Sequence, residues 1–175
     1  MAIVTQSFKS KLVTDTVSAD KMGLYVFGGM NEKGQPTNDL YHIKPWNKEN
    51  SELYDARKGG YLDGMDPKVY FEIKKIKADG TPPEPRWLHS AEHLGKYLYI
   101  FGGRNVGLFK YIHNTALNDI HIFDIEKKSW KTLAIYGYLP TSVWGHSSTV
   151  HDNQIVIFGG KNLDRYAHGN RLKNQ

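Results

Sequence analysis

The sequence predicts an all-β protein assembled from small four-stranded antiparallel sheets. An internal repeat is the first reason: RWLHSAEHLGKYLYIFGGRN at residues 86–105 returns as VWGHSSTVHDNQIVIFGGKN at 143–162, at an offset of 57. The second reason is the short apolar runs LYVF, YLYIF and IVIF, separated by glycine-containing turns, which favour short strands. Third, no stretch has a sustained helical period.

The repeat extends beyond its most similar part. Residues 73–105 align with 130–162 without a gap, with apolar residues opposite apolar ones and Arg104 opposite Lys161. An earlier copy begins with GLYVFGG at 23–29 and continues with NDLYHI at 38–43, which corresponds to NDIHIF at 118–123. The chain therefore contains two repeats and the beginning of a third.

Each repeat is interpreted as four strands in order. A strand follows His-Ser, a second ends in Phe-Gly-Gly, a third begins after Asn-Asp, and a fourth carries Trp130 or its counterpart Ile73. Glycines allow positive φ where a neighbouring sheet crowds the chain, and Asn-Asp is suited to a turn. We expect Trp130 and Ile73 to fill the gap between adjacent sheets.

This pattern resembles the kelch repeat, which is marked by a Gly-Gly doublet, an aromatic residue about a dozen positions later and a Trp further on. Those marks are Gly28-Gly29 with Tyr41, and Gly102-Gly103 with Phe123 and Trp130; the last copy has Gly159-Gly160. The PRWLHS segment at 85–90 looks like the connection between kelch units. The sequence departs from the pattern at Ile73, where Trp is expected, and at Val143, which is opposite Arg86.

The resemblance implies blades of a β-propeller. We expect one partial propeller over residues 1–175: blade 1 at about 12–79 with an insertion at 44–68, blade 2 at about 86–136, blade 3 begun at about 143–162, and a polar tail at 163–175. A closed ring needs at least four blades, so this ring is incomplete. Either a further stretch of a longer chain or another copy would complete it, and we favour the former.

The composition bears on partners and compartment. The net charge of +5 is spread along the chain without a basic block, which argues against nucleic acid. The absence of cysteine excludes disulfides and thiolate chemistry and suits a reducing compartment. Neither a signal peptide nor a membrane span is indicated, so we expect a cytoplasmic protein; kelch relatives include cytoskeletal and ciliary scaffolds.

The motifs give no reason to expect catalysis, a cofactor or a metal. His89 and His146 are equivalent and could be metal ligands, but packing between blades is the simpler interpretation of two histidines without acidic companions. Kelch enzymes related to galactose oxidase need a cysteine, and the iron motif of the plant specifier proteins is missing. Nucleophile-elbow, zinc-protease, P-loop and dinucleotide motifs are also missing.

The function predicted from the sequence is a non-catalytic scaffold that binds another protein. In the loops between strands we expect contact from the residues Arg86, Trp87, Arg104, Phe109, Tyr111 and Lys161, and in the insertion from Trp46 and Tyr54.

Alternatives remain for several of these residues. Arg86 could pair within its own blade junction, Trp87 could fill space between blades, and Trp46 and Tyr54 could pack on a blade edge. The rival function is a regulatory propeller segment of a larger enzyme, such as a kelch-fused Ser/Thr phosphatase.

Overall fold

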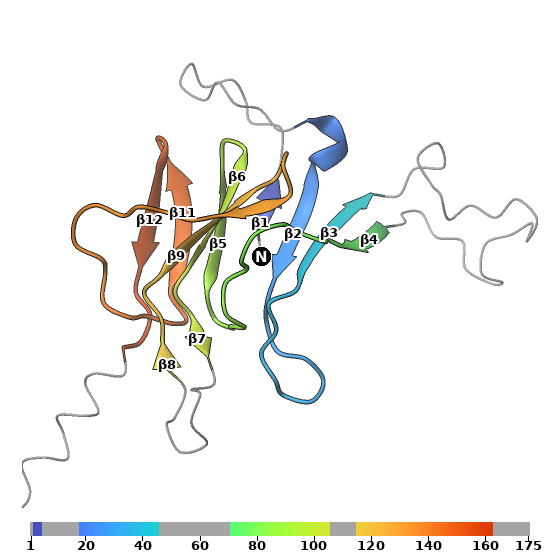
Figure 1. Ribbon diagram of the computed structural model, residues 1–175. Helices are drawn as coiled ribbons and strands as arrows, with labels where there is room; N and C mark the ends of the chain where they lie inside the picture. Colours follow the sequence, from blue (N-terminus) through green and yellow to red (C-terminus); the bar gives the residue numbers. More distant parts are fainter. Residues whose placement is uncertain (1, 5–17, 46–70, 106–114, 163–175) are drawn as a thin grey trace, which may run out of the picture.

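The computed structural model describes residues 2–4, 18–45, 71–105 and 115–162 (Figure 1). Nearly all of its regular structure is strand, as predicted. The elements are β1 (Ala2–Val4), the short 3-10 helix η1 (Ala19–Lys21), β2 (Gly23–Phe27), β3 (Leu40–Pro45), β4 (Phe71–Lys75), β5 (Ser90–Leu94), β6 (Tyr97–Phe101), β7 (Arg104–Asn105), β8 (Thr115–Ala116), β9 (Ile120–Asp124), β10 (Ser129–Lys131), β11 (Ser147–His151) and β12 (Gln154–Phe158). Among these described residues no helix has the length and apolar character needed to cross a bilayer.

The strands form the antiparallel sheets that the repeat predicted. Blade 1 is the sheet β1-β2-β3-β4, and blade 2 is the sheet β10-β9-β6-β5. Blade 3 consists, within the described residues, of the hairpin β11-β12. A small ribbon, β7-β8, extends from blade 2 after its Gly-Gly doublet.

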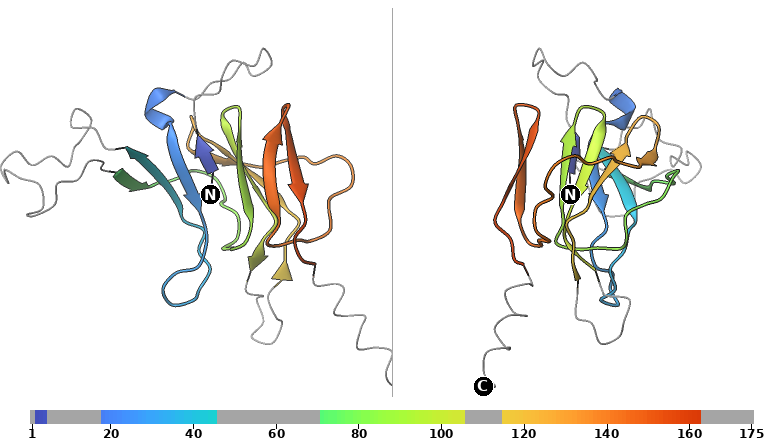
Figure 2. Two further views of the ribbon diagram at one scale, coloured as in Figure 1. Left: turned by 180° about the vertical axis from the view of Figure 1, so that it is seen from behind. Right: turned by 60° about the vertical axis from the view of Figure 1, so that its left-hand side comes forward.

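The three blades stand side by side, with blade 2 between the other two (Figures 1 and 2). The first strand of each blade lies on the inner side, where β5 contacts both β1 and β11. The sheets therefore fan outward from their first strands, as blades of an open propeller do.

The main core lies between blades 1 and 2. Phe27 from blade 1 packs edge-on against Trp130 of blade 2, with ring centroids 5.2 Å apart, and Trp130 in turn contacts Phe123. The prediction that Trp130 fills the gap between sheets is therefore confirmed. Its counterpart Ile73 is 64% exposed against 8% for Trp130, because it lies on the face of blade 1 that no other described sheet covers.

The Gly-Gly doublets have the role that the sequence predicted. Gly102 and Gly103 have φ values of +60° and +95°, and a Cβ on Gly102 would come within 2.7 Å of the Val143 carbonyl oxygen. The close approach allows the Gly103 amide to donate a 2.9 Å hydrogen bond to that carbonyl. In blade 1 the Gly29 amide donates in the same way to the Arg86 carbonyl, at 2.8 Å. The doublets of blades 1 and 2 thus link each of these blades to the connection leading into the next.

Blade 1 begins earlier in the chain than expected. Its first strand is Ala2–Val4, which pairs with β2, whereas we placed the start of this blade near residue 12. In blade 3 a tight turn containing the positive-φ pair Asp152 and Asn153 joins the first two strands. In blade 1 the first strand ends at Val4 and the second begins at Gly23, so the two are not adjacent in the sequence. The repeat pattern therefore did not identify Ala2–Val4 as a strand. Most of the predicted insertion, from residue 46, lies outside the described residues.

Candidate functional site

The connection between blades 1 and 2 places two neighbouring side chains in different environments. Arg86 has no exposed surface, and its guanidinium forms a forked pair with Asp119 of blade 2 at 2.6 and 2.8 Å. It also donates to the carbonyl oxygens of Glu84 and Gly102, at 3.0 and 3.1 Å. Arg86 therefore fastens the connection to blade 2 through side-chain and backbone acceptors.

Asp119 is held as a carboxylate by this arrangement. Burial by itself would raise the pKa of Asp119, but hydrogen bonds from Arg86 and His121 outweigh it and hold the pKa well below its usual value. Because Arg86 is buried and paired, its guanidinium is not available to a partner. This corrects our inclusion of Arg86 among the contact residues and agrees with the alternative that it pairs within its own blade junction.

Trp87, the next residue, lies beside the Gly-Gly doublet of blade 2. Its backbone forms a two-way bridge with Arg104, with N–H···O distances of 3.0 and 2.8 Å. Blade 3 repeats the arrangement with Trp144 and Lys161, at 3.2 and 2.9 Å. The two bridges place a tryptophan beside a cation in each blade, at the end of the molecule where β7 and β8 lie (Figure 1).

These four side chains form a continuous stack across the two blades, which we call the Trp-cation ladder (Trp87, Arg104, Trp144, Lys161). The Arg104 guanidinium carbon lies 4.3 Å from the Trp144 ring centroid and 5.6 Å from that of Trp87. The Lys161 ammonium lies 5.2 Å from the Trp144 ring. Such cation–π contacts orient a positive group without neutralising it.

Arg104 differs from Arg86 in what balances its charge. Among the described residues no carboxylate lies within salt-bridge distance of Arg104 or Lys161, so indole faces are their nearest partners. A guanidinium that contacts an aromatic ring without a carboxylate partner keeps N–H groups for a forked bond to a carboxylate. The ladder can therefore bind an acidic group beside an apolar aromatic surface.

The structure brings together Trp87, Arg104 and Lys161 from the predicted contact set. Trp144 was missing from that set, although its equivalence to Trp87 in the repeat was a signal that could have placed it there. Phe109 and Tyr111 in one loop and Trp46 and Tyr54 in the insertion lie outside the described residues.

The two equivalent histidines lie between the blades. His146 packs edge-on against Phe101 and its Nε2 is 2.8 Å from the Ser90 hydroxyl, while His89 packs against Phe27. Burial lowers the pKa of His89 to about 3, so this imidazole is neutral near pH 7. Among the described residues, no three potential metal ligands come together.

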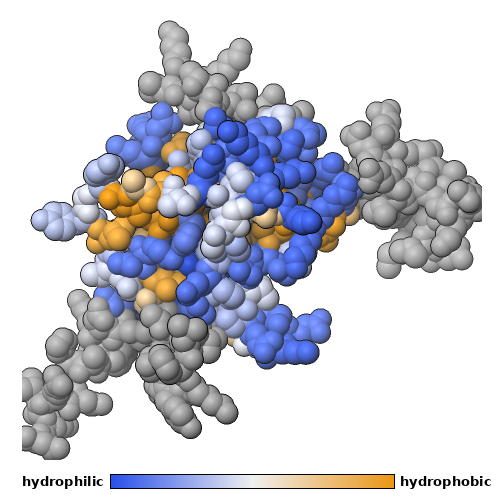
Figure 3. Space-filling view, in the orientation of Figure 1, coloured by the Kyte–Doolittle hydropathy of each residue, from blue (hydrophilic) through white to orange (hydrophobic). Residues whose placement is uncertain are grey.

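Blade 3 has an apolar face without a neighbour among the described residues. Phe158 is 80% exposed, whereas the equivalent Phe101 in blade 2 is 4% exposed and packs on His146. Val156, on the same face, is 46% exposed. Figure 3 shows an apolar area on this side of the molecule.

A groove of about 450 Å³ lies between the outer parts of blades 2 and 3. Its walls include Tyr99 and Ile122 from blade 2 and Ile155 and Ile157 from blade 3. In the junction of blades 1 and 2, Phe123 and Trp130 from the outer strands of blade 2 pack into the core, and blade 3 has no such outer strands among the described residues.

Comparisons with known proteins agree with this architecture. The family model of the KLHDC2/KLHL20/DRC7 kelch-repeats domain matches residues 7–172. The chain is 32% identical over 141 residues to acyl-CoA-binding domain-containing protein 5 of Arabidopsis thaliana, covering 79% of this chain and 17% of that protein. It is 32% identical over 157 residues to human host cell factor 1 (81% and 7%) and 34% identical over 97 residues to human kelch domain-containing protein 3 (53% and 25%).

Repeated blades, Gly-Gly junctions and an open set of sheets define a kelch-type propeller, a class whose domains are in general non-catalytic protein-interaction modules. The chain belongs to the kelch-repeat family. It spans a quarter or less of the length of each of these relatives.

Proposed function

We propose that this chain is part of a non-catalytic scaffold that grips a partner protein through the Trp-cation ladder. The observation that carries the proposal is the state of Arg104, which lies across two indole rings and has no carboxylate partner among the described residues. The preferred partner segment is an acidic one with an apolar side chain nearby, since carboxylates suit the guanidinium and apolar groups suit the tryptophans.

A displayed library of acidic peptides tests the proposal. Peptides selected by the wild-type chain are expected to lose about tenfold or more in affinity to Arg104→Ala and Trp144→Ala, because hot-spot truncations commonly cost this much. Lys33→Ala, which removes an exposed positive charge in the loop between β2 and β3, is the matched control. Peptides that bind all of these variants equally, with all variants folded by circular dichroism, would contradict the ladder as the contact site.

We also propose that another kelch blade covers the exposed face of blade 3, from a longer chain or from a second copy. Phe27 and Phe101 each pack on a histidine of the following blade, and Phe158 repeats their position without such a partner among the described residues. Burying a large apolar side chain that is otherwise exposed contributes about 1.5–3 kcal/mol to the free energy of association or folding.

Oxidative footprinting of the natural full-length protein tests this covering blade. Phe158 is expected to be protected, while the fully exposed Tyr138 reacts freely and serves as the internal control. Labelling of Phe158 as fast as of Tyr138 would show that its face remains open.

A further inference from the structure

A cleft lined by lysines lies at the outer rim of the junction between blades 1 and 2. Its volume is about 320 Å³, and Tyr25, His42 and Ile125 form part of its wall. The lysines come from η1, from β3, from β4 and the chain after it, and from the turn between β9 and β10. They are Lys21, Lys44, Lys74, Lys75, Lys77 and Lys128.

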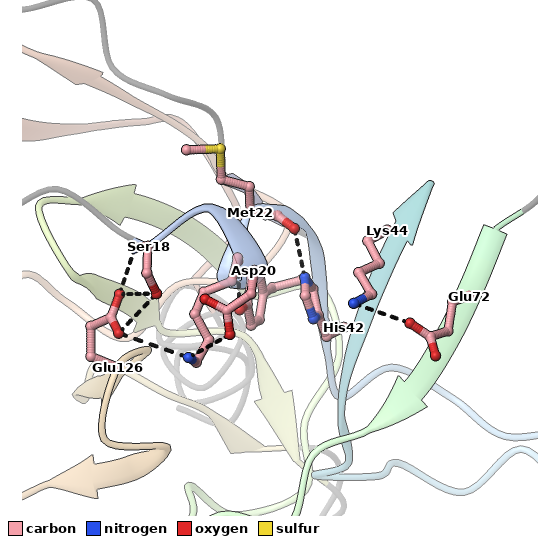
Figure 4. Close-up of polar contacts among 9 residues, drawn as sticks. Ser18, Asp20, Met22, His42, Lys44, Glu72 and Glu126 are labelled. Atoms are coloured by element: carbon pink, nitrogen blue, oxygen red, sulfur yellow. Dashed lines mark hydrogen bonds and ion pairs between the residues drawn. The ribbon is translucent and has the colours of Figure 1, made fainter. Parts of the chain in front are cut away.

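Hydrogen bonds and ion pairs connect several residues in and beside the cleft wall (Figure 4). His42 stacks on Tyr25 with ring centroids 4.6 Å apart, and its Nε2 lies 2.8 Å from the Met22 carbonyl oxygen. The backbone amide of Ser18 donates a hydrogen bond to the Glu126 carboxylate at 2.7 Å, which connects the segment before η1 to the β9-β10 turn. This contact joins the two blades on either side of the cleft.

Carboxylates balance only part of this positive charge. Lys44 and Lys74 pair with the buried Glu72 at 3.2 and 2.8 Å. Lys75 pairs with Asp39, and Lys21 pairs with Asp20 and Glu126.

The remaining charge belongs to Lys77 and Lys128. Among the described residues neither has a carboxylate within salt-bridge distance. The two lysines lie on neighbouring segments, because the Asp79 amide donates to the Lys128 carbonyl oxygen at 2.9 Å. The cleft thus has two uncompensated ammonium groups on one side.

The repeat offers a comparison for one wall of this cleft. By strand register, His42 and Lys44 of blade 1 correspond to Ile122 and Asp124 of blade 2. Ile122 lies in the wall of the apolar groove between blades 2 and 3, and so does Ala134, which the repeat places opposite Lys77. The repeated blade face therefore does not itself require a histidine or a lysine at these two positions of the cleft.

We propose that this cleft binds an anion bearing two or more phosphate groups. Its volume fits a compact oligophosphate, and separate ammonium groups suit phosphate oxygens arriving from different directions. The ligand is either a free oligophosphate or a protein segment with neighbouring phosphoserines. The cleft shares no lining residue with the Trp-cation ladder, so the two sites are tested separately.

Calorimetric titration of the whole chain with inorganic triphosphate tests the site. Lys77→Gln combined with Lys128→Gln is expected to weaken binding about tenfold, and added salt to weaken it further. Each single variant should have roughly the square root of that effect. Lys33→Gln removes the same charge from the loop between β2 and β3, at the opposite end of blade 1 (Figure 1), and is expected to change the affinity little.

A peptide with two adjacent phosphoserines forms the second arm of the experiment. Tighter binding of the peptide than of triphosphate assigns the phosphates to a protein, and the reverse assigns them to a free oligophosphate. If Lys33→Gln and Lys77→Gln weakened phosphate binding equally, the binding would reflect general attraction of an anion to a cationic protein. That result would overturn the proposal. Absence of binding of both probes would overturn it as well.

Discussion

Replacing Asp119 by Asn tests whether the blade connection is held by its buried ion pair. The substitution keeps the shape and one acceptor oxygen but removes the charge opposite Arg86, which has no exposed surface. Breaking a buried pair by removing one partner costs about 3–5 kcal/mol. Because the Asp119 side chain is 41% exposed, we expect the lower end, a loss of about 3 kcal/mol in the free energy of unfolding.

Urea unfolding followed by tryptophan fluorescence and by circular dichroism measures this loss. With a slope of about 2 kcal/mol per molar urea, the midpoint should fall by about 1.5 M. Asp39→Asn is the matched control, because Asp39 occupies the same position in blade 1 but pairs with the exposed Lys75 at 2.7 Å. If Asp39→Asn lowered the midpoint as far as Asp119→Asn, the reasoning from burial would be refuted.

Two further predictions concern the blade junctions. Gly102→Ala should destabilise the chain at least twice as much as Gly95→Ala in the same urea assay, because both glycines have φ near +60° but only at Gly102 would a Cβ meet the neighbouring connection. His89 should make the chain sensitive to acid: burial lowers its pKa to about 3 from 6.5, so the unfolded state binds the proton more tightly and stability falls below about pH 6.5. The loss in the free energy of unfolding approaches about 1.4 kcal/mol per pH unit. His89→Gln should flatten the plot of stability against pH between pH 6.5 and 4.5, whereas the exposed control His151→Gln should not. Equal costs for the two glycine variants, or an unchanged pH curve for His89→Gln, would contradict these explanations.

The fold was largely predictable because local rules and the repeat agree. The Phe-Gly-Gly segments combine a strand-forming apolar run with glycines that the following turn requires, and both occur together in blades 1 and 2. Trp130 could be assigned to the gap between sheets because its strand position is apolar in both repeats, as Ile73 and Trp130, and because a tryptophan buries a large apolar area. These features depend on neighbours within a few residues or on strand alternation, and both can be read from the sequence.

The candidate site was only partly predictable, because it depends on contacts between blades. Arg86 and Trp87 are adjacent in sequence, yet one is buried beside Asp119 and the other lies beside Arg104. The partner of Arg104 in the ladder is Trp144, which belongs to the next blade. The lysine cleft is harder still, since it collects residues from Lys21 to Lys128. Distances between such segments cannot be read from the sequence.

Comparison of the blades with one another separates structural positions from functional ones. Positions that are the same in successive blades, such as Phe27 and Phe101, repeat a packing role, because each of these phenylalanines packs on a histidine of the following blade. Positions at which equivalent residues differ between blades are not held constant by this packing. His42 in place of Ile122 is such a change, because it brings a polar group to the wall of the lysine cleft where the groove of the next junction has an apolar one. The same comparison applies to the Trp-cation ladder, where the backbone bridge is repeated while the cation changes from Arg104 to Lys161. The repeated bridge therefore belongs to the fold, whereas the identity of the cation is not set by the bridge.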